Sequence, residues 1–254
     1  MSASLQRPVR DNPVNSETLT SLPTLIRPAM AATAREVYEM SLWSGFLDNT
    51  GSPIHKVPHY FPAYERHFNR YINRPLIFLE IGCGQGGSLQ MWKRYFGPYA
   101  QIIGIDKRPE CATLQEDQVA IRIGEQQDQT FLSNVIDEFG TPDIVLDDGS
   151  HMMSHIMAAF RYLYPRTAPD GIYMVEDLCT AYWEEYEGGL CRPGSFIELC
   201  KSLVDELNAE WTRGALPPTD FTRTTQSMHF YDSIAVFERG RTLCKAPLMI
   251  PRQK

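Results

Sequence analysis

LIFLEIGCGQGGS, residues 76–88, joins a short apolar run to a loop with four glycines. The run has the length of a buried β-strand, and glycines at 82, 84, 86 and 87 permit a tight turn with close backbone approach of a ligand. Residues 88–96 then carry apolar side chains at helical spacing. This strand, glycine loop and helix predict the first unit of an alternating α/β fold.

The alternation continues along the chain. Further apolar strands are predicted at 101–106, 120–124, 143–147 and 171–177, with helices at 128–140 and 151–171. Strands that are apolar throughout and alternate with helices predict a parallel sheet covered on both faces. SMHFYDSIAVFER, residues 227–239, predicts a hairpin around Tyr231 and Asp232. We therefore expect a Rossmann-like α/β fold, mostly parallel, with a C-terminal antiparallel hairpin.

The overall composition and net charge of the chain exclude several classes of protein. The chain has 254 residues, 43% of them hydrophobic and 22% charged, with a net charge of −7 and a pI near 5.4. This acidic balance predicts no nucleic-acid partner. No apolar stretch has the length of a signal-peptide core or a membrane span. The six cysteines form no CxxC pair and are typical of reduced thiols, so we expect a cytoplasmic protein without a membrane partner.

The predicted organisation has three parts. Residues 1–24 are polar and proline-containing and predict a flexible N-terminal arm, and residues 25–74 predict a helical, aromatic lead-in or lid with a helix near 31–44. Residues 75–254 would form the ligand-binding domain. Within it, residues 184–220 resemble an insertion that could shape an acceptor pocket.

The glycine loop indicates a nucleotide-type cofactor. Glu80 opens an E-x-G-x-G pattern through Gly82 and Gly84, and Asp106 ends the next strand about 20 residues on, where an acid can bind ribose hydroxyls. An NAD enzyme would share that acid. The polar residues 125–128, suited to an adenine edge, and the terminal hairpin favour S-adenosylmethionine and the class I methyltransferase fold.

Several stretches together resemble the magnesium-dependent sugar O-methyltransferases, which include macrolide-sugar enzymes of the mycinamicin type and rhamnosyl and mycobacterial methylmannoside enzymes. The resemblance is carried by LEIGCGQGGSLQMWKRYF, GID, IVLDDGSH, YMVEDLCTAYW, SMHFYDSIAVFE and the lead-in GSPIHKVPHYFPAYERHF. It spans roughly residues 50–240. Longer members of the family carry a separate N-terminal domain, which we expect this chain to lack.

The resemblance implies a role for each matching position. It makes Asp148, Glu176 and Asp177 ligands of Mg²⁺ and His151 the catalytic base. It implies cofactor contacts for the glycine loop and the residues around it, with Gln126 or Asp128 near the adenine: Glu80, Gly82, Gly84, Gly86, Ser88, Asp106, Gln126, Asp128 and Asp147. Glu125 departs from the aspartate expected there.

The chemistry of methyl transfer suits these residues. An alcohol is a poor nucleophile, so the enzyme must orient it and remove its proton, and imidazole titrates near neutral pH. Three carboxylates at neighbouring strand ends would repel one another without a cation, and Mg²⁺ prefers oxygen ligands.

Structural alternatives remain open for single residues. Asp147 or Ser150 could cap the next helix, and Glu176 and Asp177 could be solvated strand ends. We expect His155 to be structural. The aromatic residues of the lead-in and Trp183 are typical of a core, although a sugar ring could stack on them.

The expected activity is methyl transfer from S-adenosylmethionine to a hydroxyl of a sugar or glycosylated natural product. An O-methyltransferase acting on a catechol-like or polyketide hydroxyl is an alternative, since vicinal oxygens would bind the metal equally well. A non-catalytic S-adenosylmethionine-binding protein would have no use for a metal triad beside a base. A homo-oligomer is also compatible with the sequence.

Overall fold

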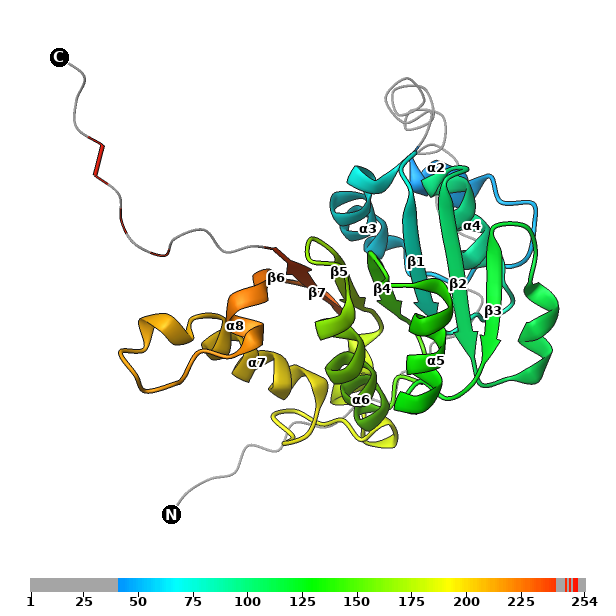
Figure 1. Ribbon diagram of the computed structural model, residues 1–254. Helices are drawn as coiled ribbons and strands as arrows, with labels where there is room; N and C mark the ends of the chain where they lie inside the picture. The colour runs from blue at the N-terminus through cyan, green and yellow to red at the C-terminus, as the bar shows by residue number, and fades with distance from the viewer. Residues whose placement is uncertain (1–40, 241–244, 246, 248, 251–254) are drawn as a thin grey trace, which may run out of the picture. The chain divides into compact units, whose positions relative to one another are not determined.

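The computed structural model describes residues 41–240, 245, 247, 249 and 250. The predicted arm at 1–24 and most of the predicted helix at 31–44 lie outside these residues. Residues 41–240 belong to one compact unit (Figure 1). The described part of the lead-in, 41–74, is therefore packed within the same unit as the sheet.

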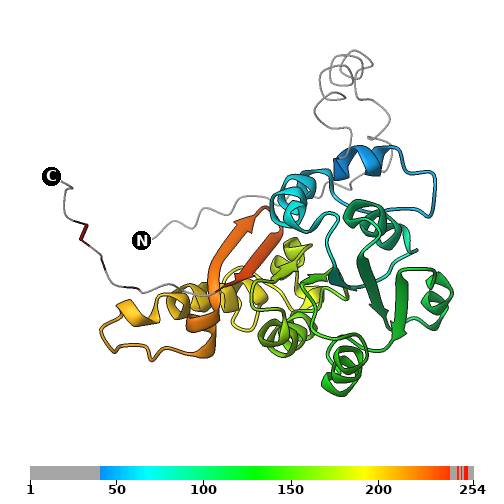
Figure 2. The ribbon, with the colours of Figure 1, turned by 45° about the horizontal axis from the view of Figure 1, so that its top comes forward.

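A seven-stranded sheet organises this unit, with strand order β3-β2-β1-β4-β5-β7-β6. The first five strands pair in parallel, while β7 pairs antiparallel with both β5 and β6 (Figure 2). The strands are β1 (Leu76–Ile81), β2 (Ala100–Asp106), β3 (Val119–Ile123), β4 (Ile144–Asp147), β5 (Ile172–Val175), β6 (Thr225–Tyr231) and β7 (Ile234–Arg239). The expected mostly parallel fold with a C-terminal antiparallel hairpin is confirmed.

The helices and turns fill the connections between strands. The α-helices are α2 (Leu42–Leu47), α3 (Phe61–Phe68), α4 (Gly87–Phe96), α5 (Gln129–Phe139), α6 (Met153–Leu163), α7 (Phe196–Leu207) and α8 (Asp220–Thr224). The 3-10 turns are η2 (Pro58–Tyr60), η3 (Asn69–Tyr71), η4 (Pro109–Leu114), η5 (Tyr164–Arg166), η6 (Leu178–Tyr182), η7 (Glu184–Tyr186) and η8 (Ala209–Trp211).

Alternate residues of each strand enter two separate cores, as the two-residue period of a strand requires. On β1, Phe78 faces a core built with α2, α3 and α4. Its neighbour Leu79 faces the opposite core, built with α5, α6 and α7. Both faces of the parallel sheet are covered, which explains why its strands are apolar throughout.

One predicted helix is shorter than expected, and one segment contains a helix that was not predicted. The helix predicted at 151–171 is shorter, because His151 has a left-handed backbone before its start and Pro165, which lacks an amide hydrogen, follows its end. The predicted insertion at 184–220 contains a regular amphipathic helix, α7, capped by Ser195. Within the described residues, no helix is long and apolar enough to cross a membrane.

Candidate active site

The glycine loop after β1 lies tightly against the end of β4. Gly82 has φ +94°, and a Cβ there would stand 2.1 Å from the carbonyl oxygen of Asp148, so only glycine fits. Gly84 also has positive φ (+53°), but a Cβ on it would meet no atom within 4 Å. The loop thus packs on one side and leaves open space on the other, as a ligand cradle requires.

Glu80 and Ser88 lie beneath this loop. The fully buried carboxylate of Glu80 accepts hydrogen bonds from Ser88 Oγ (2.9 Å) and Trp92 Nε1 (3.3 Å). The two predicted cofactor residues therefore bond to each other. Their observed contacts support the loop from the protein interior.

Asp106, predicted to bind the ribose, ends β2 beside the loop. Its carboxylate accepts from the Cys83 amide at 3.0 Å and from the amide, Nε and Nη2 of Arg108 at 2.9–3.0 Å. Burial opposes ionisation, but the hydrogen bonds from Arg108 and Cys83 lower the pKa of Asp106 to about 2. With about four acceptor positions filled, a ribose hydroxyl would have to displace a donor of Arg108.

The two residues predicted to lie near the adenine, Gln126 and Asp128, make different kinds of contact. Gln126 Nε2 donates to the buried carboxyl of Asp147 (3.2 Å), and its Oε1 accepts from the Ser150 amide (2.7 Å). Burial raises the pKa of Asp147 to about 7. Asp128 is the N-cap of α5 and accepts from the amides of residues 130 and 131. Helix capping thus accounts for the observed contacts of Asp128.

A lysine from the lead-in lies among the acidic side chains. Lys56 Nζ is 2.5 Å from Asp148 Oδ2, 2.5 Å from Glu176 Oε1 and 3.4 Å from Glu80 Oε1, and its side chain is 1% exposed. Burial by itself would lower the pKa of Lys56, but Asp148 and Glu176 outweigh burial and hold it well above its usual value. Lys56 was absent from the predicted site. A single lysine that follows His55 and precedes an aromatic stretch gives little sign of such a role.

The predicted metal triad is therefore unevenly exposed. Glu176 is buried, and while one of its oxygens contacts Lys56, the other accepts a hydrogen bond from the hydroxyl of Tyr64. Burial and the nearby Asp148 raise the pKa of Glu176. The side chains of Asp148 and Asp177 are 20% and 28% exposed, so they are the members of the triad that solvent reaches.

Asp177 and His151 face each other across the strand ends. Asp177 Oδ2 lies 3.8 Å from His151 Nε2, and Asp177 Oδ1 accepts from the hydroxyl of Tyr60 at 2.7 Å. Both Asp177 (φ 57°) and His151 (φ 59°) have left-handed backbones, which non-glycine residues adopt at a cost and often at functional sites. Ligand atoms of Asp148, His151 and Asp177 all lie within 4.8 Å of one another.

The neighbouring histidine has a different environment. His155 Nδ1 lies 2.9 Å from Ser150 Oγ, on the first turns of α6. Tyr186, which the sequence analysis did not single out, places its ring 6.2 Å from that of His151 and 5.9 Å from that of Trp183. The rings of Tyr186 and Trp183 thus form an aromatic row that starts at His151.

Trp183, at the end of this aromatic row, also lines a groove beside the strand ends. The groove, of about 530 Å³, is lined mainly by apolar residues of η6, α7 and the β6–β7 turn, including Leu178, Trp183, Val204 and Phe230. Leu178 follows Asp177 directly, and its amide donates to the carbonyl of Ser233 in that turn (3.0 Å). The groove therefore begins one residue along the chain from the acidic cluster formed by Asp148, Glu176 and Asp177.

The sheet order, the glycine loop and the acids at the strand ends define a class I methyltransferase fold. No family model matches the chain. Among solved structures, the MycE methyltransferase from the mycinamycin biosynthetic pathway in complex with Mg, SAH and mycinamycin VI has a TM-score of 0.69 and 34% identity, covering 84% of this chain and 56% of that one. A second crystal form, with Mg and SAH, gives a TM-score of 0.71 and 28% identity over 97% of this chain and 70% of that one.

The curated relatives of the chain are methyltransferases that act on sugar hydroxyls. The chain is 39% identical over 209 residues to the 8-demethyl-8-(2-methoxy-alpha-L-rhamnosyl)-tetracenomycin-C 3'-O-methyltransferase of Streptomyces olivaceus, covering 77% of this chain and 53% of the relative. It is 38% identical over 202 residues to the mycinamicin VI 2''-O-methyltransferase of Micromonospora griseorubida, covering 72% and 49%. Over these residues the chain is similar to sugar O-methyltransferases. The chain spans about half the length of the curated relatives it matches.

Proposed function

We propose that the protein transfers a methyl group from S-adenosylmethionine to a hydroxyl of a sugar on a glycosylated natural product, with Mg²⁺ at the acidic cluster. The observation that carries the proposal is the meeting of Asp148, His151 and Asp177 at the strand ends beside the glycine loop. The relatives named above are sugar O-methyltransferases, and MycE has been solved with Mg and SAH, which supports the same chemistry for this chain.

The donor set fits a divalent metal ion. Asp148 and Asp177 would hold Mg²⁺ through their carboxylates, with Glu176 behind them, paired with Lys56. Lys56 contacts Asp148 and Glu176 but not Asp177, so the partly exposed Asp177 carboxylate is left to bind a second cation together with Asp148. When bound, Mg²⁺ supplies a Lewis acid that lowers the pKa of the acceptor hydroxyl.

The glycine loop fits the methyl donor. The open side of Gly84 leaves room for S-adenosylmethionine, and Asp106 and Gln126 flank that space from the ends of β2 and β3. We assign direct contact to the loop backbone at Gly82, Gly84 and Gly86, to Asp106 and to Gln126. The remaining predicted contacts (Glu80, Ser88, Asp128 and Asp147) hold these groups in position.

His151 is the proposed general base. Mg²⁺ prefers oxygen to imidazole nitrogen, so His151 stays free to accept the proton of the acceptor hydroxyl at Nε2. Asp177 Oδ2 lies 3.8 Å from this nitrogen, so the proposed base faces the proposed metal ligands.

Chelation should abolish turnover. We expect S-adenosylhomocysteine release with a panel of glycosides to disappear in EDTA and to return with Mg²⁺, because the acceptor hydroxyl then regains its Lewis acid. Asp148→Ala should be as inactive as the chelated enzyme, whereas Asp137→Ala, at an exposed aspartate on α5, should remain active. Activity indifferent to EDTA would contradict the metal assignment.

The groove is the proposed position of the apolar ring system that carries the acceptor sugar. Trp183→Ala should raise KM for such a glycoside about fivefold to tenfold and change kcat less than twofold, because ring contact contributes about 1 kcal/mol to binding. Trp211→Ala removes a similarly exposed tryptophan outside the groove and should leave KM unchanged. Steady-state kinetics with the glycoside and its free sugar would check this, and an equal KM in Trp183→Ala would reject the assignment.

A further inference from the structure

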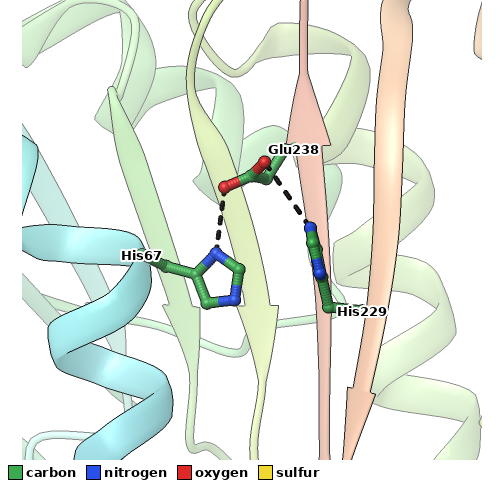
Figure 3. A group of neighbouring side chains, drawn as sticks. All are labelled: His67, His229 and Glu238. Carbon is green, nitrogen blue, oxygen red and sulfur yellow. Dashed lines mark hydrogen bonds and ion pairs between the residues drawn. The ribbon is translucent and has the colours of Figure 1, made fainter.

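A second group of metal-ligand side chains lies where α3 meets the β6–β7 hairpin. His67 is on α3, His229 on β6 and Glu238 on β7, and one ligand atom of each lies within 4.8 Å of the other two. Figure 3 shows the Glu238 carboxylate between the two imidazole rings. The proposed methyl transfer uses none of these residues.

The spacing of the three side chains matches that of ligands around one small ion. Glu238 Oε1 lies 2.9 Å from His67 Nδ1, and Glu238 Oε2 lies 3.6 Å from His229 Nε2 (Figure 3). A tetrahedral zinc ion with bonds of about 2.0–2.1 Å separates its ligand atoms by roughly 3.4 Å. The two observed distances, which run to different oxygens of Glu238, lie on either side of that value, and one ligand atom from each side chain lies within 4.8 Å of the other two.

The ring of His67 is already held in an orientation suited to metal binding. Its Nε2 lies 2.9 Å from the hydroxyl of Tyr231, so Nδ1 faces Glu238. Metal-bound histidines are commonly oriented by such a hydrogen bond on the other ring nitrogen. Ser227 Oγ, 3.0 Å from both His229 Nε2 and Glu238 Oε2, gives the cluster a further oxygen.

Metal ligands must be deprotonated, so zinc would displace the proton that His67 Nδ1 shares with Glu238. The hydrogen bond from His67 lowers the pKa of Glu238 to about 2, with a smaller contribution from Ser227. Burial and the neighbouring His67 lower the pKa of His229. Glu238 is therefore a carboxylate at neutral pH, and the short distances among the three side chains carry the proposal.

We propose that His67, His229 and Glu238 form a zinc-binding site that joins α3 to the edge hairpin. Two imidazoles and one carboxylate suit zinc, whereas Mg²⁺ prefers an all-oxygen set, so this site and the acidic cluster select different ions. The role is structural. Tyr64 lies one turn before His67 on α3 and bonds Glu176, so the ion fixes the helix that supports the acidic cluster.

Zinc titration of the metal-stripped protein tests the proposal. Calorimetry should give one zinc ion per chain at this site, and saturating zinc should raise Tm by about 5 °C. Co²⁺ in place of zinc should give the visible absorption of a four-coordinate site. A wild-type protein whose Tm does not respond to zinc, or which gives no such Co²⁺ spectrum, would overturn the proposal.

Variants separate this site from other zinc binding. His229→Ala and Glu238→Gln should each lose the Tm response, and His229 is partly exposed on an edge strand, so the apo fold should tolerate its loss. His55→Ala, at an exposed histidine, and Asp148→Asn, in the acidic cluster, should both keep the response. A response retained in His229→Ala, or lost in Asp148→Asn, would place the ion elsewhere.

Discussion

Replacing Lys56 with methionine should lower the free energy of unfolding by about 3–5 kcal/mol, because it leaves buried carboxylates without their cation. Methionine preserves most of the side-chain volume, so packing alone would cost far less. The carboxylates left behind are Asp148, at 2.5 Å from the ammonium, and the fully buried Glu176, also at 2.5 Å. Chemical denaturation in EDTA measures the loss.

The matched control is Lys201→Met. Lys201 pairs with Glu198 on the surface of α7, where its side chain is 56% exposed, and exposed pairs contribute about 0–1 kcal/mol. Adding Glu176→Gln to Lys56→Met should recover part of the lost stability by removing one unpaired charge. Mg²⁺ should stabilise Lys56→Met more than the wild type. If Lys56→Met unfolds at the wild-type denaturant concentration, the ammonium does not neutralise this cluster.

His151→Ala should reduce kcat by about 10²–10⁴-fold, the range that a positioned general base contributes. Binding of S-adenosylhomocysteine should change less than twofold, because His151 is assigned to the acceptor proton and not to the cofactor. Single-turnover kinetics and calorimetry on the same protein separate the two effects. Added imidazole should restore part of the lost rate.

His155→Ala provides the comparison for this loss. It removes an imidazole four residues further on, whose Nδ1 lies 2.9 Å from Ser150 Oγ, and should reduce kcat only slightly. Equal losses in the two variants would mean that the turn after β4 needs both rings for its structure. The assignment of His151 as the base would then fail.

The fold was largely predictable from the sequence because its signals are local. Each parallel strand is an apolar run bounded by glycine or polar residues, as in Leu76–Ile81 before the glycine loop. The hairpin is confirmed with its turn at Asp232 and Ser233. The helix α7 was not predicted, because the glycines and prolines at 188–189 and 217–218 indicated an insertion between the strands.

The site was predictable only as far as it follows strand ends. Asp148 and Asp177 come together because β4 and β5 are neighbours in a parallel sheet. Lys56 reaches the same place from a segment 120 residues before Glu176, and no spacing rule connects them. Asp128 was predicted to contact the cofactor, but its observed contacts are those of a helix cap. An acidic residue after a strand can serve either purpose, and the sequence alone does not separate the two.

The position of β7 between β5 and β6 has a consequence for synthesis on the ribosome. Until residues 234–239 have emerged, β5 lacks its antiparallel neighbour and Leu178 lacks its hydrogen bond to Ser233. Asp177 precedes that bond by one residue. The nascent chain can therefore pack the glycine loop against β4 early, but it can complete the proposed acceptor groove only after the hairpin has been translated.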